Sequence, residues 1–467
     1  MIRKDTTICA PASYPGGALS IVRISGPQTY DICGKIFFPL DKNLNIKDSE
    51  GYRIIFGEIR EGNEIVDEVL AGIFKSPHSY TGEDSVEFTC HGSSYIISRI
   101  LELLIKNGAS AALPGEFTQR AFLNGKMDLS QAEAVADLVA SGSRAAHKLA
   151  IDQMRGGFSA EIEKLRAELL KFASLIELEM DFGEEDVKFA DRKELRQIVV
   201  NVKELSDNLA SSFSLGNVIR NGIPVVIAGK TNSGKSTLLN ALLNEEKAIV
   251  SDIPGTTRDV IEDTIIINGL EYRLIDTAGL RDSTDVIENL GIRKTHEKIQ
   301  QSSVILMVDE ITEPAEEINK RADNIRKLTA DTDAKLILVI NKTDLGDQPV
   351  IDTLSQKIYI DIDEKLLFIS AKNLTGLERL RKVLGKVVDK ANLNSESVII
   401  SNLRHYEALR NVSAAMVRIL SGLDQNVPED LLAIDIRQAI HYLGEITGQI
   451  TTDEILGNIF KNFCIGK

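Results

Sequence analysis

The chain has 467 residues, a formal net charge of −15, 43% hydrophobic residues and 26% charged residues. This length suggests about three domains, and the composition is that of a globular protein with an ample core. No run of about 18 uncharged apolar residues occurs, so we expect no membrane span. The acidic balance excludes broad coating of nucleic acid, because basic contacts to phosphates supply most of that affinity. A local basic patch remains compatible with it.

The N-terminal residues and the cysteines indicate the cellular compartment in which we expect the protein. Residues 1–10 have neither the apolar block of a signal peptide nor a basic transit segment, so we expect a cytoplasmic protein. Cys9, Cys33, Cys90 and Cys464 lack paired spacing. The sequence therefore predicts neither a disulfide framework nor a zinc site.

The first segment, residues 1–120, has the pattern of an α+β domain. Short apolar runs at 20–24, 69–74 and 85–89 are separated by Pro-Gly and Thr-Gly turns and predict strands. A helix is expected from residue 94 to about 107, with its apolar side chains on one face.

The second segment, residues 121–220, has a helical pattern. Ser130 followed by Glu133 predicts a capping box at the start of a helix. After this helix start, apolar residues recur at the spacing of a helix-bundle seam: Ile162, Leu165, Leu169, Phe172 and Ile176. At the end of the segment, residues 217–222 have the composition of a linker.

The third and fourth segments predict an insertion. Strands alternate with helices over 221–386, as in a parallel-sheet nucleotide domain. A helical pattern returns over 387–467, with one apolar face formed by Leu432, Ile436, Ala439, Ile440 and Leu443. We therefore expect a multidomain α+β and α/β protein in which one helical-bundle domain is split by an inserted P-loop domain.

Residues 229–236, with the sequence GKTNSGKS, match the phosphate-binding loop of P-loop proteins. The strand-like run 224–228 precedes them and a helix is expected to begin by residue 237, which is the context that the motif requires. The two glycines allow the loop's N–H groups to turn toward a phosphate. Lys235 is expected to bridge the β- and γ-phosphates and Ser236 to bind Mg²⁺. The predicted ligands here are Asn232, Ser233, Gly234, Lys235, Ser236 and Thr237.

Three further signatures follow in order and predict GTP as the ligand. Asp276 ends a strand-like run and suits a carboxylate that helps to hold Mg²⁺. Asp344 can accept both N–H groups of the guanine edge, which adenine lacks. The residues in these signatures are Asp276, Thr277, Ala278, Gly279, Asn341, Lys342, Thr343, Asp344, Ser370, Ala371 and Lys372. The expected reaction is hydrolysis of a phosphate anhydride.

The loop after the first signature carries the expected switch. Thr257, within 255–259, is expected to give Mg²⁺ its second hydroxyl ligand. Leu280 stands where Ras-type enzymes have the glutamine that orients water. Because an apolar side chain cannot orient water, another group must do so.

At the level of motifs, the chain resembles the MnmE (TrmE) family of tRNA-uridine-modification GTPases over essentially its whole length. Besides the nucleotide signatures, the resemblance rests on residues 23–26, 79–84, 114–117, 120–126 and 463–467. It implies a folate-binding, dimerising N-terminal domain, a split helical domain and an inserted Ras-like G domain.

The resemblance also implies a function and its partners. Members of the family work with an FAD-dependent partner, MnmG (GidA), in a heterotetramer or larger complex. Together they place a carboxymethylaminomethyl or aminomethyl group on C5 of the wobble uridine of certain tRNAs. The one-carbon unit comes from 5-formyltetrahydrofolate or a related reduced folate. By position, the implied folate ligands are Arg23, Glu87, Lys126 and Lys467. The loop at 12–17 departs from the usual Pro-Pro-Gly sequence of relatives.

For the nucleotide site, the resemblance implies that K⁺ takes the place of an arginine finger when two G domains meet. Glu288 matches the glutamate that positions water. The implied K⁺ ligands are Asn232, Ser251, Ile253 and Thr256. The whole switch segment is expected to contact GTP through Ser251, Asp252, Ile253, Pro254, Gly255, Thr256 and Thr257.

Some readings stay open at this level. Cys464 has three possible interpretations. It matches a family cysteine that is linked to the modification chemistry; it lies at the spacing of a prenylation signal, although the final lysine is unsuitable for one; and it has the properties of a small buried apolar residue. The alternatives to tRNA modification are a ribosome-assembly or signalling switch, and a folate-dependent transferase regulated by GTP. No basic RNA-binding module that would favour the first alternative is visible in the sequence.

Overall fold

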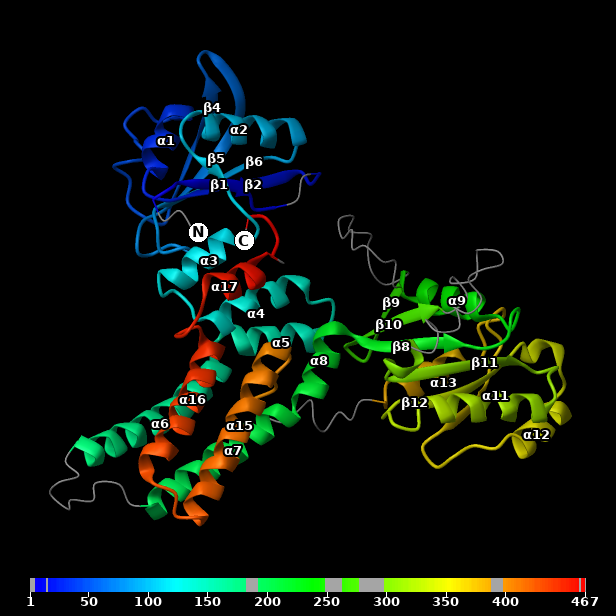
Figure 1. Cartoon of the computed structure of the whole chain (residues 1–467). Coiled ribbons are helices and arrows are strands. Elements are labelled where there is room, and N and C mark those ends of the chain that lie inside the picture. Colours follow the sequence, from blue (N-terminus) through cyan, green and yellow to red (C-terminus); the bar gives the residue numbers. More distant parts are fainter. Residues whose placement is uncertain are drawn as a thin grey trace, which may run out of the picture. The chain divides into compact units, whose positions relative to one another are not determined.

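A computed structural model describes residues 5–13, 16–181, 192–247, 263–276, 298–387, 398–461 and 463–466 (Figure 1). The chain divides into two compact units. Unit 1 consists of Met1–Ala140, Ala150–Ala210 and Glu407–Lys467, and unit 2 consists of Ser141–Leu149 and Ser211–Tyr406. Among the described residues, no helix is long and apolar enough to cross a membrane.

Unit 1 contains a seven-stranded sheet in the order β3-β4-β5-β6-β2-β1-β7, antiparallel except for the pairing of β1 with β7. The strands predicted at 20–24, 69–74 and 85–89 are confirmed. The strands are β1 (Ile8–Pro11), β2 (Leu19–Ser25), β3 (Phe37–Pro39), β4 (Arg53–Glu61), β5 (Glu64–Phe74), β6 (Ser85–His91) and β7 (Ser110–Ala111).

Two helices, α1 (Thr29–Ile36) and α2 (Ser94–Lys106), cover one face of this sheet and share a single apolar core with it. The α2 bounds confirm the predicted helix. Because side chains alternate across a strand, the other face carries a second set of residues. On β3, β4 and β5 that set includes four exposed apolar residues, and we call them the outer-face patch: Phe38, Ile54, Phe56 and Leu70.

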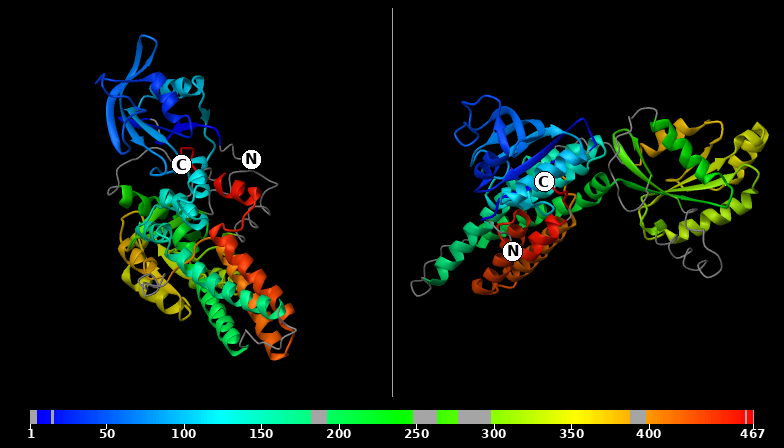
Figure 2. Two further views of the ribbon diagram at one scale, coloured as in Figure 1. Left: turned by 90° about the vertical axis from the view of Figure 1, so that its left-hand side faces the viewer. Right: turned by 90° about the horizontal axis from the view of Figure 1, so that it is seen from above.

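The helices of unit 1 form a bundle, in which α6 and α16 make the most extensive helix pair and α7 and α15 lie beside them (Figure 2). The residues predicted for the two seams are buried, so the bundle built from both sides of the insertion is confirmed. The described helices that unit 1 contains wholly or mostly are, besides α1 and α2, α3 (Glu116–Leu123), α4 (Leu129–Ala140), α6 (Gly157–Asp181), α7 (Arg192–Ser211), α15 (Leu403–Asp424), α16 (Glu429–Thr447) and α17 (Asp453–Phe460), and α5 (Arg144–Met154) is divided between the two units.

Two local predictions in the helical segment are wrong. The cap of α4 is formed by Asp128 and Gln131, which accept each other's backbone N–H at 2.9 and 3.0 Å, so Ser130 and Glu133 lie inside the helix. Asp128 immediately precedes Leu129, the first residue of α4, so its carboxylate lies at the position from which a side chain caps the free N–H groups of the first turn. The predicted linker at 217–222 belongs to helix α8 (Phe213–Asn221), which ends at Gly222 with φ +79°.

Unit 2 is a six-stranded sheet in the order β13-β12-β11-β8-β10-β9, parallel except for the β9–β10 pair. Helices cover both faces of the sheet, each over its own apolar core (Figure 2). The strands are β8 (Ile223–Ala228), β9 (Asp263–Ile267), β10 (Leu270–Asp276), β11 (Val304–Glu310), β12 (Lys335–Asn341) and β13 (Lys365–Phe368). The helices that the structure describes wholly within unit 2 are α8, α9 (Lys235–Lys247), α11 (Ala315–Leu328), α12 (Gln348–Lys357) and α13 (Leu377–Leu384), with a short η2 (Thr343–Leu345).

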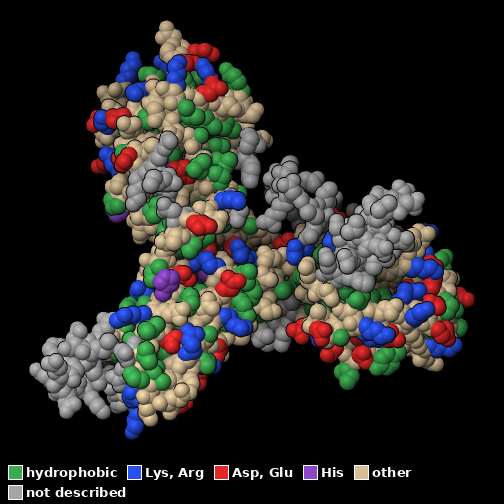
Figure 3. Space-filling model, viewed as in Figure 1, with side chains coloured by type: hydrophobic (Ala, Val, Ile, Leu, Met, Phe, Trp, Pro, Cys, Tyr) green, Lys and Arg blue, Asp and Glu red, His purple; other side chains and the backbone are tan. Residues whose placement is uncertain are grey.

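The parallel strands place the predicted nucleotide signatures at one edge. β8, β10, β11 and β12 run side by side, and their carboxyl ends meet there. This is the edge at which open α/β sheets bind ligands. Acidic and basic side chains are intermixed over the visible surfaces of both units (Figure 3). The fold class predicted from the sequence is confirmed, and the four segment boundaries stay predictions.

Candidate nucleotide and folate sites

The phosphate-binding loop follows β8 and leads directly into α9. Its two glycines have positive φ, +146° at Gly229 and +92° at Gly234. A Cβ at Gly229 would lie 2.0 Å from the carbonyl oxygen of Val308, and one at Gly234 would lie 2.3 Å from Nδ2 of Asn341. Any other residue at either position would therefore force the loop away from β11 or from Asn341.

Lys235 is buried, although it carries a charge, because the loop itself surrounds its ammonium group. Its Nζ donates to the carbonyl of Gly229 at 3.0 Å and to that of Lys230 at 2.7 Å. The next residue, Ser236, is exposed in the first turn of α9, where helix N–H groups favour anions. Asn232 is exposed with φ +65°. These positions fit a phosphate and its metal ion.

Asn341 joins the loop to the segments predicted to bind the base. It is 2% exposed, its Nδ2 donates to the carbonyl of Ser233 at 3.0 Å, and its Oδ1 accepts from the backbone N–H of Ala371 at 2.9 Å. Three of the four signatures thus meet at one amide side chain.

Asp344 is the expected guanine acceptor, and it is exposed with its carboxylate already oriented. Its Oδ1 accepts from the hydroxyl of Ser370 at 2.5 Å. That hydrogen bond, and the nearby charges of Lys372 and Lys342, lower the pKa of the Asp344 carboxyl. The group is therefore ionised at neutral pH and can accept two N–H groups from guanine.

Asp276 is the last of the predicted nucleotide-binding residues whose place in the fold the structure describes. It is the last residue of β10 and pairs in register with Ile227, two residues before Gly229. The remaining predicted residues, namely 251–257, 277–279, Glu288 and Lys467, lie outside the described part of the chain. Their roles stay predictions.

The predicted folate residues lie on unit 1 around the outer face of β2 and β6. The Nε of Arg23 donates to Glu87 at 2.8 Å, and NH1 donates to the carbonyl of Gly466 at 3.2 Å. Tyr80 and Phe117 flank the guanidinium, with ring centroids 5.3 and 5.5 Å from its Cζ. The structure thus brings Arg23, Glu87 and the C-terminal tail together.

Lys126 lies against the loop that carries Tyr80. Its Nζ donates to the carbonyl of Pro77 at 2.9 Å, and the side chain is exposed. Sequence reasoning did not select Tyr80 and Phe117 as site residues. Both stand in motifs that carry the family resemblance, 79–84 and 114–117, so the signal was present.

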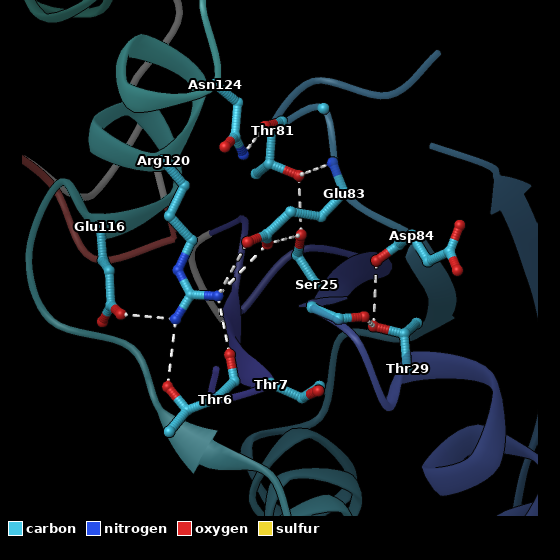
Figure 4. A network of polar contacts seen from close by, with 12 residues as sticks. Thr6, Thr7, Ser25, Thr29, Thr81, Glu83, Asp84, Glu116, Arg120 and Asn124 are labelled. Carbon is cyan, nitrogen blue, oxygen red and sulfur yellow. Dashed lines mark hydrogen bonds and ion pairs between the residues drawn. The ribbon is translucent and has the colours of Figure 1, made fainter. Parts of the chain in front are cut away.

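A largely buried ionic network lies in the segments that carry Tyr80 and Phe117, and its centre is Arg120 (Figure 4). The guanidinium of Arg120 donates to the carbonyl of Thr6 at 2.7 Å, to Glu83 at 3.2 Å and to Glu116 at 3.0 Å. Ser25 donates to the same Glu83 carboxylate at 2.9 Å. The network ties α3, which carries Phe117, to the loop that carries Tyr80. A buried pair of this kind fixes geometry more than it adds stability.

Comparison with known proteins decides the family. Residues 129–464 match the MnmE helical domain, and residues 7–126 match the N-terminus of the GTP-binding protein TrmE. Proteins called tRNA modification GTPase MnmE are 50% identical in Bacteroides fragilis, over 99% of this chain and 100% of that protein, and 48% identical in Cytophaga hutchinsonii, over 99% and 98%.

The chain belongs to the MnmE (TrmE) family of tRNA modification GTPases.

Likeness to solved structures is weaker. A GTP-binding protein from Sulfolobus solfataricus in complex with GDP is 18% identical, with a TM-score of 0.27, over 60% of this chain and 79% of that one. The G domain of the FeoB iron transporter from T. maritima is 19% identical, with a TM-score of 0.25, over 35% and 98%. The family assignment rests on the full-length relatives.

Cys464 differs from the other three cysteines of this MnmE-family chain. Cys9, Cys33 and Cys90 are buried in the N-terminal core, whereas Cys464 is exposed, so its reading as a buried apolar residue is wrong. Its carbonyl accepts from the N–H of Gly115 at 3.3 Å, which fastens the tail to the start of α3. Cys464 is thus an exposed residue of the tail, two positions before Gly466, whose carbonyl accepts from Arg23.

Replacing Asp344 with asparagine would turn one of the two oxygens that we expect to accept from guanine into an NH2 donor. We expect the affinity for a fluorescent GDP analogue to fall at least about 100-fold, because a buried guanine N–H would lose its partner and face an amide donor. Titration of the full chain measures it, with Asp347→Asn, an exposed carboxylate nearby, as the control. Equal affinities of the two variants would remove Asp344 from the base site.

N-Ethylmaleimide at pH 8 should label Cys464 alone. Burial raises the pKa of Cys9 to about 12 and that of Cys90 to about 11, and it raises the pKa of Cys33 well above its usual value. These thiols are therefore protonated as well as covered. Intact-mass spectrometry should show one adduct, which Cys464→Ser abolishes. Two or more adducts on the folded chain would contradict the arrangement.

Proposed function

We propose that this chain hydrolyses GTP in order to drive modification of C5 of the wobble uridine in certain tRNAs. The product carries a carboxymethylaminomethyl or aminomethyl group, an FAD-dependent partner of the MnmG (GidA) type takes part, and a reduced folate supplies the one-carbon unit. Two arrangements in one chain support this proposal. Asn341 links the phosphate loop to the segment that contains Asp344 and Ser370, and Arg23 links Glu87 to the C-terminal tail. We place this activity in the cytoplasm, where tRNA is found.

At the nucleotide site, each residue has a distinct task. Lys235 would move from the loop carbonyls to the β- and γ-phosphates, whose charge it neutralises. Ser236 and Thr257 would hold Mg²⁺, which would offset the negative charge of the phosphates. Asp344 would select guanine. All of these act by position and charge, which is how proteins catalyse phosphoryl transfer.

Water must be oriented by a residue other than Leu280. We assign this role to Glu288, acting when two G domains meet. Asn232, Ser251, Ile253 and Thr256 would hold K⁺, which supplies the positive charge that an arginine finger gives elsewhere. The exposed, positive-φ position of Asn232 at the tip of the phosphate loop suits such contact with a second G domain.

Glu288→Ala should slow single-turnover GTP hydrolysis at least about 100-fold while GTP binding survives, because the loss falls on the transition state alone. Replacing K⁺ with Na⁺, or Asn232 with alanine, should slow it about 10-fold or more. Glu317→Ala, which changes an exposed carboxylate on α11, is the control. Hydrolysis by Glu288→Ala at the rate of this control would rule out the assigned role.

At the folate site, Glu87 and its partner Arg23 would face one end of the ligand, where Glu87 would accept from the pterin N–H groups. Lys126 and Lys467 would hold the glutamyl carboxylates at the other end. Tyr80 and Phe117 give the site apolar walls. Arg23 and Glu87 already bind each other in this structure, so the ligand meets a preorganised pair.

Calorimetry with 5-formyltetrahydrofolate tests this site. We expect Arg23→Met and Glu87→Gln each to weaken binding about 10- to 100-fold, since each removes a charged hydrogen-bonding partner. Arg53→Met, on the exposed end of β4, should bind as the unaltered chain does. Absence of measurable heat with the well-folded unaltered chain would refute a folate role.

A homodimer is proposed from the outer-face patch. Ile54, Phe56, Leu70 and Phe38 are 72, 47, 43 and 41% exposed on adjacent strands. The patch continues across β5 and β6 toward Glu87, because Ile54 pairs with Gly72 and Gly72 pairs with Glu87. An apolar sheet face of this kind favours a protein partner, and a second copy would cover it next to the folate site.

Ile54→Asp combined with Leu70→Asp should convert the nucleotide-free dimer into a monomer, because charges would be buried at the contact. Light scattering after gel filtration measures the mass. The control is Ile362→Asp, at a side chain in unit 2 that is 97% exposed. A dimer that survives the double change would place the interface elsewhere.

A further inference from the structure

Four charged side chains of unit 2 form a chain that begins in the phosphate loop. Lys230, the residue after Gly229, pairs through Nζ with Glu313. The other oxygen of Glu313 lies 3.2 Å from NH2 of Arg321, in α11. The same nitrogen lies 2.8 Å from Oδ1 of Asp309, in β11. The loop is thus connected by charge to a strand and a helix that do not belong to any nucleotide signature.

This chain of charges runs from a half-exposed end to a fully buried one. The side chains of Lys230, Glu313, Arg321 and Asp309 are 56, 10, 25 and 0% exposed. Burial raises the pKa of the Asp309 carboxyl and the charge of Arg321 opposes this shift. Because a carboxylate without water needs a cation, Asp309 holds the guanidinium in one place. Arg321 in turn holds Glu313 where Lys230 can reach it.

The backbone of the same two loop residues is held from the other side. The carbonyl of Val308, which precedes Asp309, occupies the space where a Cβ of Gly229 would lie. The carbonyls of Gly229 and Lys230 both accept from Lys235. Residues 229–230 are therefore fixed by β11, by the ammonium of Lys235 and by Glu313, in the conformation from which Lys235 would turn to a phosphate.

We propose that Glu313, held by Arg321 on the buried Asp309, is a positioning residue for the phosphate loop. It anchors Lys230 and so keeps the loop ready for phosphate, without touching the nucleotide itself. This proposal rests on the assignment of residues 229–236 as the phosphate-binding loop. A preorganised loop lowers the ordering cost of binding, so its loss should appear in nucleotide release.

Stopped-flow release of a fluorescent GDP analogue from the full chain tests the proposal. Glu313→Gln and Lys230→Met should each speed release about 3- to 10-fold, in the range of a partly buried ion pair. The double variant should be no faster than either single one, because both changes break one contact. Asp309→Asn should reproduce the effect of Glu313→Gln. The control is Glu317→Gln, an exposed carboxylate in the first turn of α11.

The melting temperature separates positioning from folding. The proposal expects faster release by Glu313→Gln with a melting temperature within about 2 °C of the unaltered chain, because glutamine keeps the volume of glutamate and one acceptor oxygen. Release within twofold of the control, or additive effects of Glu313→Gln and Lys230→Met, would overturn it.

Lys235→Ala tests the underlying assignment separately. If the unaltered chain binds GDP and Lys235→Ala binds equally well, the phosphate loop itself has been assigned wrongly. If Lys235→Ala loses binding while Glu313→Gln behaves as the control, only the positioning role fails.

Discussion

The amide side chain of Asn341 sets the geometry on which the nucleotide site depends. It is buried, and it uses both of its ends, one on the phosphate loop at Ser233 and one on the base-binding segment at Ala371. Gly234 makes this possible, because any side chain there would occupy the place of the amide nitrogen. Phosphate and base recognition are therefore joined in one rigid unit, and a buried amide that lost either partner would carry a substantial desolvation cost.

Much of the fold could be predicted from the sequence, because short motifs and local periodicity carry the information. The order of the nucleotide signatures, the helical periodicity of Ile162 to Ile176 and the alternating strands were sufficient to predict the fold class. The cap at Asp128 and the helix at 213–221 were missed, because several polar residues compete for a helix end and composition alone does not separate a linker from a short helix. The charges around Glu313 could not be predicted either, because they meet only when β11, α11 and the loop are folded together.

The site around Arg23 could not be predicted from local sequence patterns. Its members come from β2, β6, α3, the loop at 76–84 and the C-terminal tail, which are far apart in the sequence. Without the family resemblance, nothing in their spacing would have connected them. The buried network of Arg120, Glu83 and Glu116 then accounts for the rigid arrangement of walls that a flat, multiply charged ligand requires.

The guanine site and the Arg23 site lie in different units, so the central claim is that GTP turnover and uridine modification are coupled. Nucleoside mass spectrometry of tRNA tests this most directly, in cells lacking the gene and supplied with either the unaltered chain or Glu288→Ala. The account predicts that the C5-substituted wobble uridine disappears with the gene, returns with the unaltered chain and stays absent with the variant. A nucleoside profile that never changes would contradict it.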